Sequence, residues 1–275
     1  MLRTRVFTAL VLLSLVLAAL WLGRVAFVAL AALMFGAAIW EWLRLAQLPG
    51  RAPLVGSVLL VGVLIGLDSS GAGPGTTGLL LICSAAAALW LTIAAILVQA
   101  QRRGFRLGRV STAVLGYLLL PAAWFALLAL YQKGLVLLFS VFAIVWIADI
   151  AAYFTGRAFG KSKLASNISP GKTWAGVAGA VAGVLVAAIA VQMIAPNAPV
   201  LSNLLFRRGA ELALPLLGVL VAASIAGDLF ESLIKRQAGM KDSSHLLPGH
   251  GGVLDRIDAL IPVLPIAYLL HGWAS

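Results

Sequence analysis

The chain has 275 residues, of which 62% are hydrophobic and only 11% are charged. Soluble domains carry about 25% charged residues, so this composition excludes an ordinary soluble domain and indicates an integral membrane protein. The formal net charge is +11. Because the basic residues lie in short segments between apolar runs, they indicate cytosolic loops and anionic lipid or nucleotide partners, and no nucleic acid.

Apolar runs in chain order predict an all-α, polytopic helical bundle with about nine transmembrane helices. The first run, Val6–Leu22, follows Arg3 and Arg5 and has no clear small-residue cleavage site, so we expect a retained first helix rather than a signal peptide. The second run ends in Trp40–Glu41–Trp42, which looks like an interfacial segment. After the first run, the predicted spans lie at roughly 25–43, 53–67, 78–100, 110–131, 134–156, 173–195, 212–234 and 257–273.

The predicted domain organisation is a single membrane domain. Residues 1–130 form N-terminal helices without an assigned role, and residues 131–275 form the catalytic helices and their polar loops. The single cysteine, Cys83, lies in an apolar run, which excludes a disulfide framework and a thiolate metal site.

The distribution of lysine and arginine predicts the orientation of the bundle. When the N-terminus is placed on one side and nine spans alternate, 16 basic residues fall on that side and 4 on the other. The positive-inside rule makes the first side cytoplasmic, which places the C-terminus outside. Both polar loops, 157–172 and 235–256, then face the cytosol, where nucleotides are found.

Two carboxylates are expected at membrane depth. Asp149 lies within an apolar run, and Asp228 follows the apolar segment 223–227. A carboxylate in this position costs at least about 2.5 kcal/mol, so each should face the protein interior or water and have a partner. Asp228, Ser232 and Lys235 share one helix face, and a carboxylate and a hydroxyl one turn apart suit Mg²⁺. A structural Lys–Asp pair is the alternative for this face.

The loop 156–173 reads GRAFGKSKLASNISPGKT and is rich in basic residues. Its GKS and GKT fragments imitate a phosphate-binding P-loop, but the spacing of the leading glycine is wrong and no parallel sheet is expected. Thr173 is a candidate cap for the following helix, and lysines beside a helix N-terminus suit phosphate. A solvated loop that obeys the positive-inside rule is the alternative.

The densest polar stretch, 232–258, reads SLIKRQAGMKDSSHLLPGHGGVLDRID. Its Pro248–Gly252 segment is a tight turn whose glycines allow close approach of backbone to a ligand. Asp255 and Asp258 are three residues apart and can face the same region. The three histidines lack the spacing of a zinc site, so zinc ligation by His250 is not expected.

This stretch resembles the signature of phosphatidate cytidylyltransferases, the CDP-diacylglycerol synthases, without a departure over its 27 residues. The upstream stretch is similar through Asp149, Ala152–Tyr153, Gly156–Arg157, Gly160–Lys161 and Ser169–Trp174. Asn167 departs where lysine is frequent in the family, and Ala175 departs where Glu or Gln is frequent. The resemblance covers about residues 149–258.

The resemblance implies the reaction of CTP with phosphatidate to CDP-diacylglycerol and pyrophosphate, with Mg²⁺ and with a second metal ion left open. It implies a multi-pass protein of the inner (plasma) membrane, and a homodimer is left open. The expected catalytic residues are Asp228, Lys235, Lys241, Asp242, His250, Asp255, Arg256 and Asp258. The expected substrate-binding residues are Lys161, Ser169, Lys172, Thr173, Arg236, Gly251 and Gly252. The expected metal ligands are Asp228 and Asp255, with Ser232 and Asp149 as further candidates.

Two other functions remain open at this point. A CTP-dependent polyprenol kinase would use the same nucleotide but would transfer the γ-phosphate and release CDP. An ion-coupled transporter would also use intramembrane carboxylates, although the paired halves with broken helices that are typical of transporters are not visible.

Overall fold

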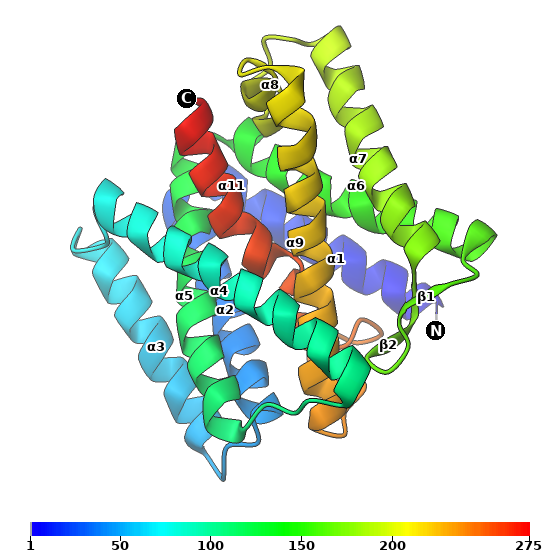
Figure 1. Ribbon diagram of the computed structural model, residues 1–275. Coiled ribbons are helices and arrows are strands. Elements are labelled where there is room, and N and C mark those ends of the chain that lie inside the picture. The colour runs from blue at the N-terminus through cyan, green and yellow to red at the C-terminus, as the bar shows by residue number, and fades with distance from the viewer. Residues whose placement is uncertain (1) are drawn as a thin grey trace. The chain divides into compact units, whose positions relative to one another are not determined.

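The computed structural model describes residues 2–275, and nearly all of its regular structure is helical (Figure 1). The first half contains α1 (Leu2–Leu22), α2 (Arg24–Leu45), α3 (Ala52–Ser69), α4 (Thr76–Arg103) and α5 (Arg109–Lys133). The second half contains α6 (Leu135–Phe159), β1 (Lys163–Ala165), β2 (Ser169–Thr173), α7 (Trp174–Ile194), α8 (Leu201–Phe206), α9 (Ala210–Gln237), α10 (Leu254–Ile257) and α11 (Leu260–Ala274).

Within residues 2–275, eight helical segments are long and apolar enough to cross a membrane. They are α2, α3, α4, α5, α6, α7, α9 and the combined segment Leu254–Ala274. The predicted polytopic bundle is therefore confirmed, with eight such segments where about nine were expected. The difference is the first helix, α1, which contributes only a shorter apolar stretch, Leu10–Leu22.

The chain divides into two compact units that are interleaved in sequence. The first contains Met1–Thr76, Arg106–Trp124 and Ile234–Ile257, and the second contains Thr77–Phe105, Phe125–Leu233 and Asp258–Ser275. Most of the polar stretch 232–258 thus belongs to the same unit as the N-terminal helices.

In the first unit, α2 packs against α3 and against the N-terminal part of α5 (Figure 1). The Trp42 indole N–H donates to the Thr112 carbonyl at 2.7 Å, and its ring lies where a Cβ of Gly116 would be. Phe35 meets Trp124 edge to face with 5.6 Å between ring centroids. Within the segment Trp40–Glu41–Trp42, for which an interfacial position was expected, Glu41 is 0% and Trp42 1% exposed, so both side chains are buried within the protein.

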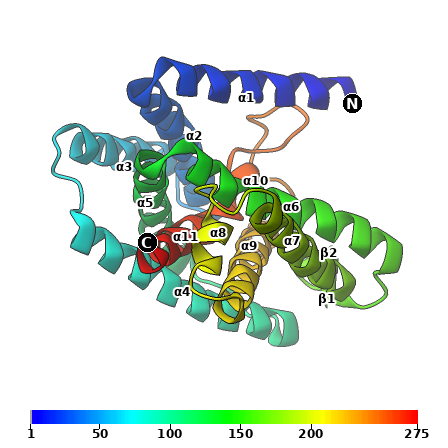
Figure 2. The same cartoon turned by 90° about the horizontal axis from the view of Figure 1, so that it is seen from above.

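In the second unit, α6 and α7 lie side by side (Figure 2). Glycines of α7 allow the close approach, since a Cβ on Gly179 would overlap the side chain of Thr155. A Cβ on Gly183 would lie 2.6 Å from the Ala151 Cβ. Small residues at a helix interface are typical of membrane proteins, in which van der Waals packing drives association.

The loop between α6 and α7 contains the antiparallel hairpin β1–β2, with Lys163 opposite Thr173 and Ala165 opposite Ser169. The sequence predicted only a loop here, because the decisive contacts come from α4. Gln101 accepts from the Asn167 N–H at 3.1 Å, and the Asn167 amide donates to the Gln101 carbonyl at 2.8 Å. The family-atypical Asn167 therefore anchors the hairpin turn.

Candidate functional site

A cavity of about 470 Å³ lies wholly within the second unit, between α6, the hairpin, α7 and α9. This volume falls in the range of roughly 300–1,000 Å³ that is usual for small-molecule sites. Four glycines, Gly156, Gly160, Gly171 and Gly176, contribute to its lining. The cavity is therefore large enough for an organic ligand, and part of its wall is backbone.

Charged side chains of both signs line this cavity. Arg157 lies in the last turn of α6, while Lys163 and Lys172 come from the hairpin. Opposite charges come from Asp149 of α6 and Asp228 of α9. Lys172 Nζ lies 2.6 Å from Asp228 Oδ2, so the hairpin and the α9 carboxylate form one electrostatic site.

The residues of the loop 156–173 that were predicted to bind substrate differ in whether they line this cavity. Lys172 and Thr173 line the cavity, whereas Lys161 and Ser169 do not. Thr173 is the N-cap of α7, as predicted, and its hydroxyl accepts from the Gly176 N–H at 3.1 Å. Sequence reasoning did not select Arg157 and Lys163, although the basic composition of this loop was the signal for them.

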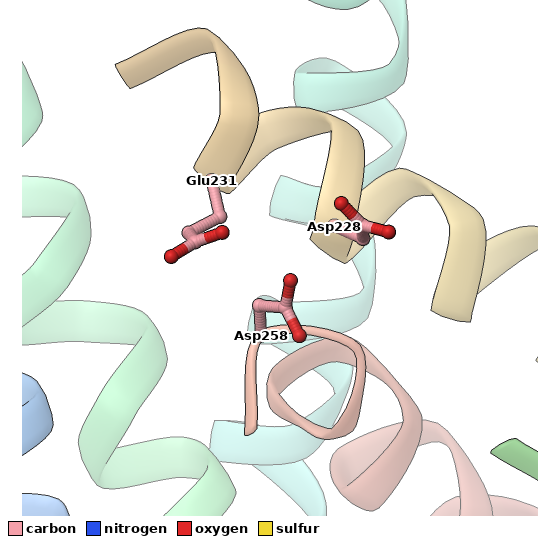
Figure 3. A group of neighbouring side chains, drawn as sticks. All are labelled: Asp228, Glu231 and Asp258. Atoms are coloured by element: carbon pink, nitrogen blue, oxygen red, sulfur yellow. The ribbon is translucent and has the colours of Figure 1, made fainter. Parts of the chain in front are cut away.

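Three carboxylates of the second unit converge beside α9, as Figure 3 shows. Asp228 and Glu231 project from α9 toward Asp258, and one oxygen of each lies within 4.8 Å of the others. Gly227 permits this approach, because a Cβ there would overlap the Asp258 carbonyl. The group consists of hard oxygen ligands, which suit Mg²⁺.

Two further details define this acidic group. The Ser232 hydroxyl lies 3.4 Å from Asp228 Oδ1, which confirms that these residues are one helical turn apart on the same face. Glu231 is 1% exposed and was not among the predicted metal ligands. Its signal in the sequence was its position three residues after Asp228, which places both carboxylates toward one side of the helix.

A separate polar network belongs to the first unit and is centred on Asp255. Its carboxylate accepts from Lys235 Nζ at 2.5 Å, from the Ser243 N–H at 2.9 Å and hydroxyl at 2.8 Å, and from the Gly252 N–H at 2.8 Å. The Lys235 and Asp255 side chains are 12% and 7% exposed. The predicted alternative of a Lys–Asp pair is thus present for Lys235, although its partner is Asp255.

The first unit also contains a cavity of about 550 Å³ formed by the turn that follows α9. Its lining brings together the predicted residues Lys241, Asp242, His250, Gly251 and Arg256. Arg256 Nη2 donates to the His250 carbonyl at 2.6 Å, which fixes the two ends of the turn to each other.

Two predicted substrate-binding residues lie outside this lining. Gly252 acts through its N–H, which it donates to Asp255. Arg236 is exposed on the last turn of α9.

Comparisons with known proteins cover the whole chain. Residues 3–273 match the cytidylyltransferase family. A protein of Pseudomonas aeruginosa named phosphatidate cytidylyltransferase is 43% identical over 290 residues, covering 100% of both chains. A protein with the same name from Haemophilus influenzae is 38% identical, and the match covers 96% of this chain and 96% of that protein. Another from Brucella suis is 36% identical, and the match covers 98% of this chain and 92% of that protein.

The similarity therefore extends over the N-terminal helices as well as over residues 149–258, where the signature motifs lie. The expected resemblance is confirmed, and the chain belongs to the cytidylyltransferase family.

Proposed function

We propose that this protein is a phosphatidate cytidylyltransferase, which converts CTP and phosphatidate to CDP-diacylglycerol and pyrophosphate. The observation that carries the proposal is the 43% identity over the full length of a relative with that name. The cavity lined by Arg157, Lys163 and Lys172 supports it, because these cations complement a polyphosphate.

The reaction needs no nucleophile from the protein. A phosphate oxygen of phosphatidate attacks the α-phosphorus of CTP and forms a new P–O bond. The bond between the α-phosphorus and the oxygen that bridges to the β-phosphate breaks, and its electron pair leaves with pyrophosphate. Because both reactants are polyanions, the protein must bring them together and neutralise the charge of the leaving group.

Magnesium fits the acidic group of the second unit. Asp228, Glu231 and Asp258 would hold the ion through carboxylate oxygens, with Ser232 and Asp149 as further candidate oxygen ligands. When bound, the ion would supply positive charge to phosphate oxygens. A second metal ion is left open.

The predicted metal role of Asp255 is a separate proposal. In the structure this carboxylate accepts hydrogen bonds from Lys235, Ser243 and Gly252. It orders the turn that bears Lys241 and His250, and a metal contact through its remaining lone pairs is tested by substitution below.

The setting proposed for the reaction is the inner membrane of the cell, with the N-terminus and both polar loops in the cytosol. The eight apolar helices support a multi-pass protein. The 16 to 4 division of basic residues, which counts α1 as a ninth span, supports the orientation, and it brings cytosolic CTP to the side where the polar loops lie. Phosphatidate is supplied from the bilayer.

The proposal is tested with purified protein in phospholipid nanodiscs that contain phosphatidate, with CTP and Mg²⁺ in solution. We expect equimolar pyrophosphate and CDP-diacylglycerol, and no pyrophosphate when phosphatidate or Mg²⁺ is omitted. Release of CDP with a polyprenol acceptor would support the kinase instead. A protein that consumes no CTP with either acceptor would contradict both enzymatic functions.

A further inference from the structure

Glu41 of α2 is a buried carboxylate that accepts hydrogen bonds from four groups of the polar segment after α9. It is 0% exposed. Its oxygens accept from the Leu254 N–H at 2.6 Å, the Val253 N–H at 3.0 Å and the Ser243 hydroxyl at 3.2 Å. They also accept from the Ser244 hydroxyl. One side chain thus holds both ends of the segment 243–254.

Glu41 and Asp255 hold the same segment between them. Ser243 Oγ lies 3.2 Å from Glu41 Oε2 and 2.8 Å from Asp255 Oδ2, so its single proton can serve only one carboxylate at a time. A Cβ on Gly252 would overlap both Ser243 Oγ and the Glu41 carboxylate. The turn therefore passes closely between two acceptors, and its backbone position depends on both.

The helix that bears Glu41 is itself firmly held. Its neighbour Trp42 packs over Gly116 of α5 and donates to the Thr112 carbonyl at 2.7 Å. Two bulky side chains on either side of Glu41 in sequence, Ile39 and Leu43, are each 1% exposed. Displacement of the Glu41 carboxylate would require disruption of this packing. The carboxylate is therefore a rigid support for the segment 243–254.

We propose that Glu41 is a positioning residue of the cytidylyltransferase reaction. It holds the segment 243–254 so that Lys241, His250 and Asp255 keep the geometry that the reaction needs. This inference rests on the proposed function and assigns a role to the N-terminal helices, for which the sequence motifs supplied none. A carboxylate is required because each of its oxygens faces a backbone N–H, which can only donate, and only a carboxylate accepts on both of its terminal atoms.

The first variant is Glu41→Gln, which keeps the volume but replaces one acceptor by an NH₂ donor that faces other donors. We expect kcat to fall about 10- to 100-fold, because small misplacements of reacting groups have effects of this size. We expect KM for CTP and phosphatidate to change less than about threefold, since the loss concerns geometry in the transition state. Hydrogen exchange at the Val253 and Leu254 amides should rise, with the hairpin 163–173 unchanged.

Two milder variants keep the inference testable if Glu41→Gln does not fold. Glu41→Asp retains the carboxylate on a shorter chain and should recover part of the lost kcat. Ser244→Ala removes one donor and should lower kcat about three- to tenfold, with faster exchange confined to segment 243–254. Glu211→Gln is the matched control, because Glu211 is exposed at the start of α9 and should retain wild-type values.

The outcomes separate this inference from the proposed function. If the wild type forms no CDP-diacylglycerol, the function fails, while amide exchange in segment 243–254 still reports whether Glu41 holds it. If Glu41→Gln and Ser244→Ala keep wild-type kcat and differ only in melting temperature, Glu41 is a stabilising core residue and the positioning role is wrong. Unchanged amide exchange in both variants would also overturn it.

Discussion

The two units each contain a Lys–Asp ion pair, and the two pairs differ in their exposure to solvent. The Lys172–Asp228 pair lines an open cavity, with side chains 24% and 36% exposed. The Lys235–Asp255 pair is nearly buried and is surrounded by further donors. In a partly exposed ion pair, ligand or solvent easily replaces one of the two partners, whereas breaking a buried ion pair is costly. The first pair therefore suits substrate binding, and the second suits organisation of the turn.

Replacement of the central carboxylates tests this assignment. We expect Asp228→Asn and Asp255→Asn each to lower turnover more than about 100-fold while the protein still inserts, since each removes a charge on which substrate or turn geometry depends. The control is Asp68→Asn, which breaks the Arg24–Asp68 pair of 2.6 Å in the first unit and should leave turnover unchanged. Near-normal turnover of either variant, with normal Mg²⁺ dependence, would remove the metal assignment of the replaced residue.

Replacement of the motif lysines should separate phosphate binding from folding. Lys172→Gln and Lys241→Gln are expected to raise KM for CTP or phosphatidate, or to lower kcat, with little change in melting temperature, because both line cavities. Lys235→Gln should differ by also lowering stability by about 3 kcal/mol, because the buried Asp255 loses its counterion.

Lys133→Gln is the matched control for this series, since Lys133 is exposed at the end of α5. Kinetic constants and melting temperatures of all four variants should be compared in the same lipid. If Lys172→Gln and Lys241→Gln were indistinguishable from Lys133→Gln, these lysines would act only as topology signals.

Among the elements, the α6–α7 pair positions the hairpin and the cavity. Gly156 of α6 and Thr173 at the start of α7 approach each other closely, since a Cβ on Gly156 would lie 3.1 Å from Thr173 Oγ1. Both residues line the cavity. A change in the spacing of these two helices should therefore alter the cavity wall directly.

A single methyl group at the α6–α7 interface should test this coupling. Gly179→Ala places a Cβ against Thr155, whose hydroxyl donates to the Ala151 carbonyl at 2.7 Å. We expect a loss of about 1–3 kcal/mol of stability from overpacking, together with a higher KM for CTP. Gly218→Ala in α9 is the control, because no atom of another element lies within 4 Å of its added Cβ and alanine favours the helix by up to about 1 kcal/mol. Equal melting temperatures for both variants would contradict the tight interface.

For the whole molecule, the distribution of basic residues leads to a prediction about topology. Cysteines introduced at positions 163 and 241 should be labelled by an impermeant maleimide only after the membrane is opened, and a cysteine at 275 should be labelled from outside. Cys83 is buried, so the unaltered chain provides a low background. Labelling of position 163 or 241 in intact cells would reverse the proposed orientation. If position 241 is cytosolic, protection of position 275 would indicate that the segment Leu254–Ala274 does not cross the bilayer.

The sequence by itself determined the class, the family and most of the helices. Apolar runs of about 20 residues are a local property, because in a bilayer each helix must satisfy its own backbone and cover it with apolar side chains. The predicted and observed spans consequently agree within a few residues, as for 110–131 against α5. The signature stretch was recognisable for a related reason: Lys241, His250 and Asp255 serve one turn and are close in sequence as well as in space.

Only the tertiary structure decided which distant residues meet. Glu41 is 212 residues from Val253, and a pattern of neighbours cannot reveal that its carboxylate is buried against that turn. The hairpin depends on Gln101, which is 66 residues from Asn167. The acidic group forms because Asp258 lies close to α9. This close approach is possible because Gly227 of α9 has no side chain. In each case the partner comes from another element, and its position follows from packing of the whole fold.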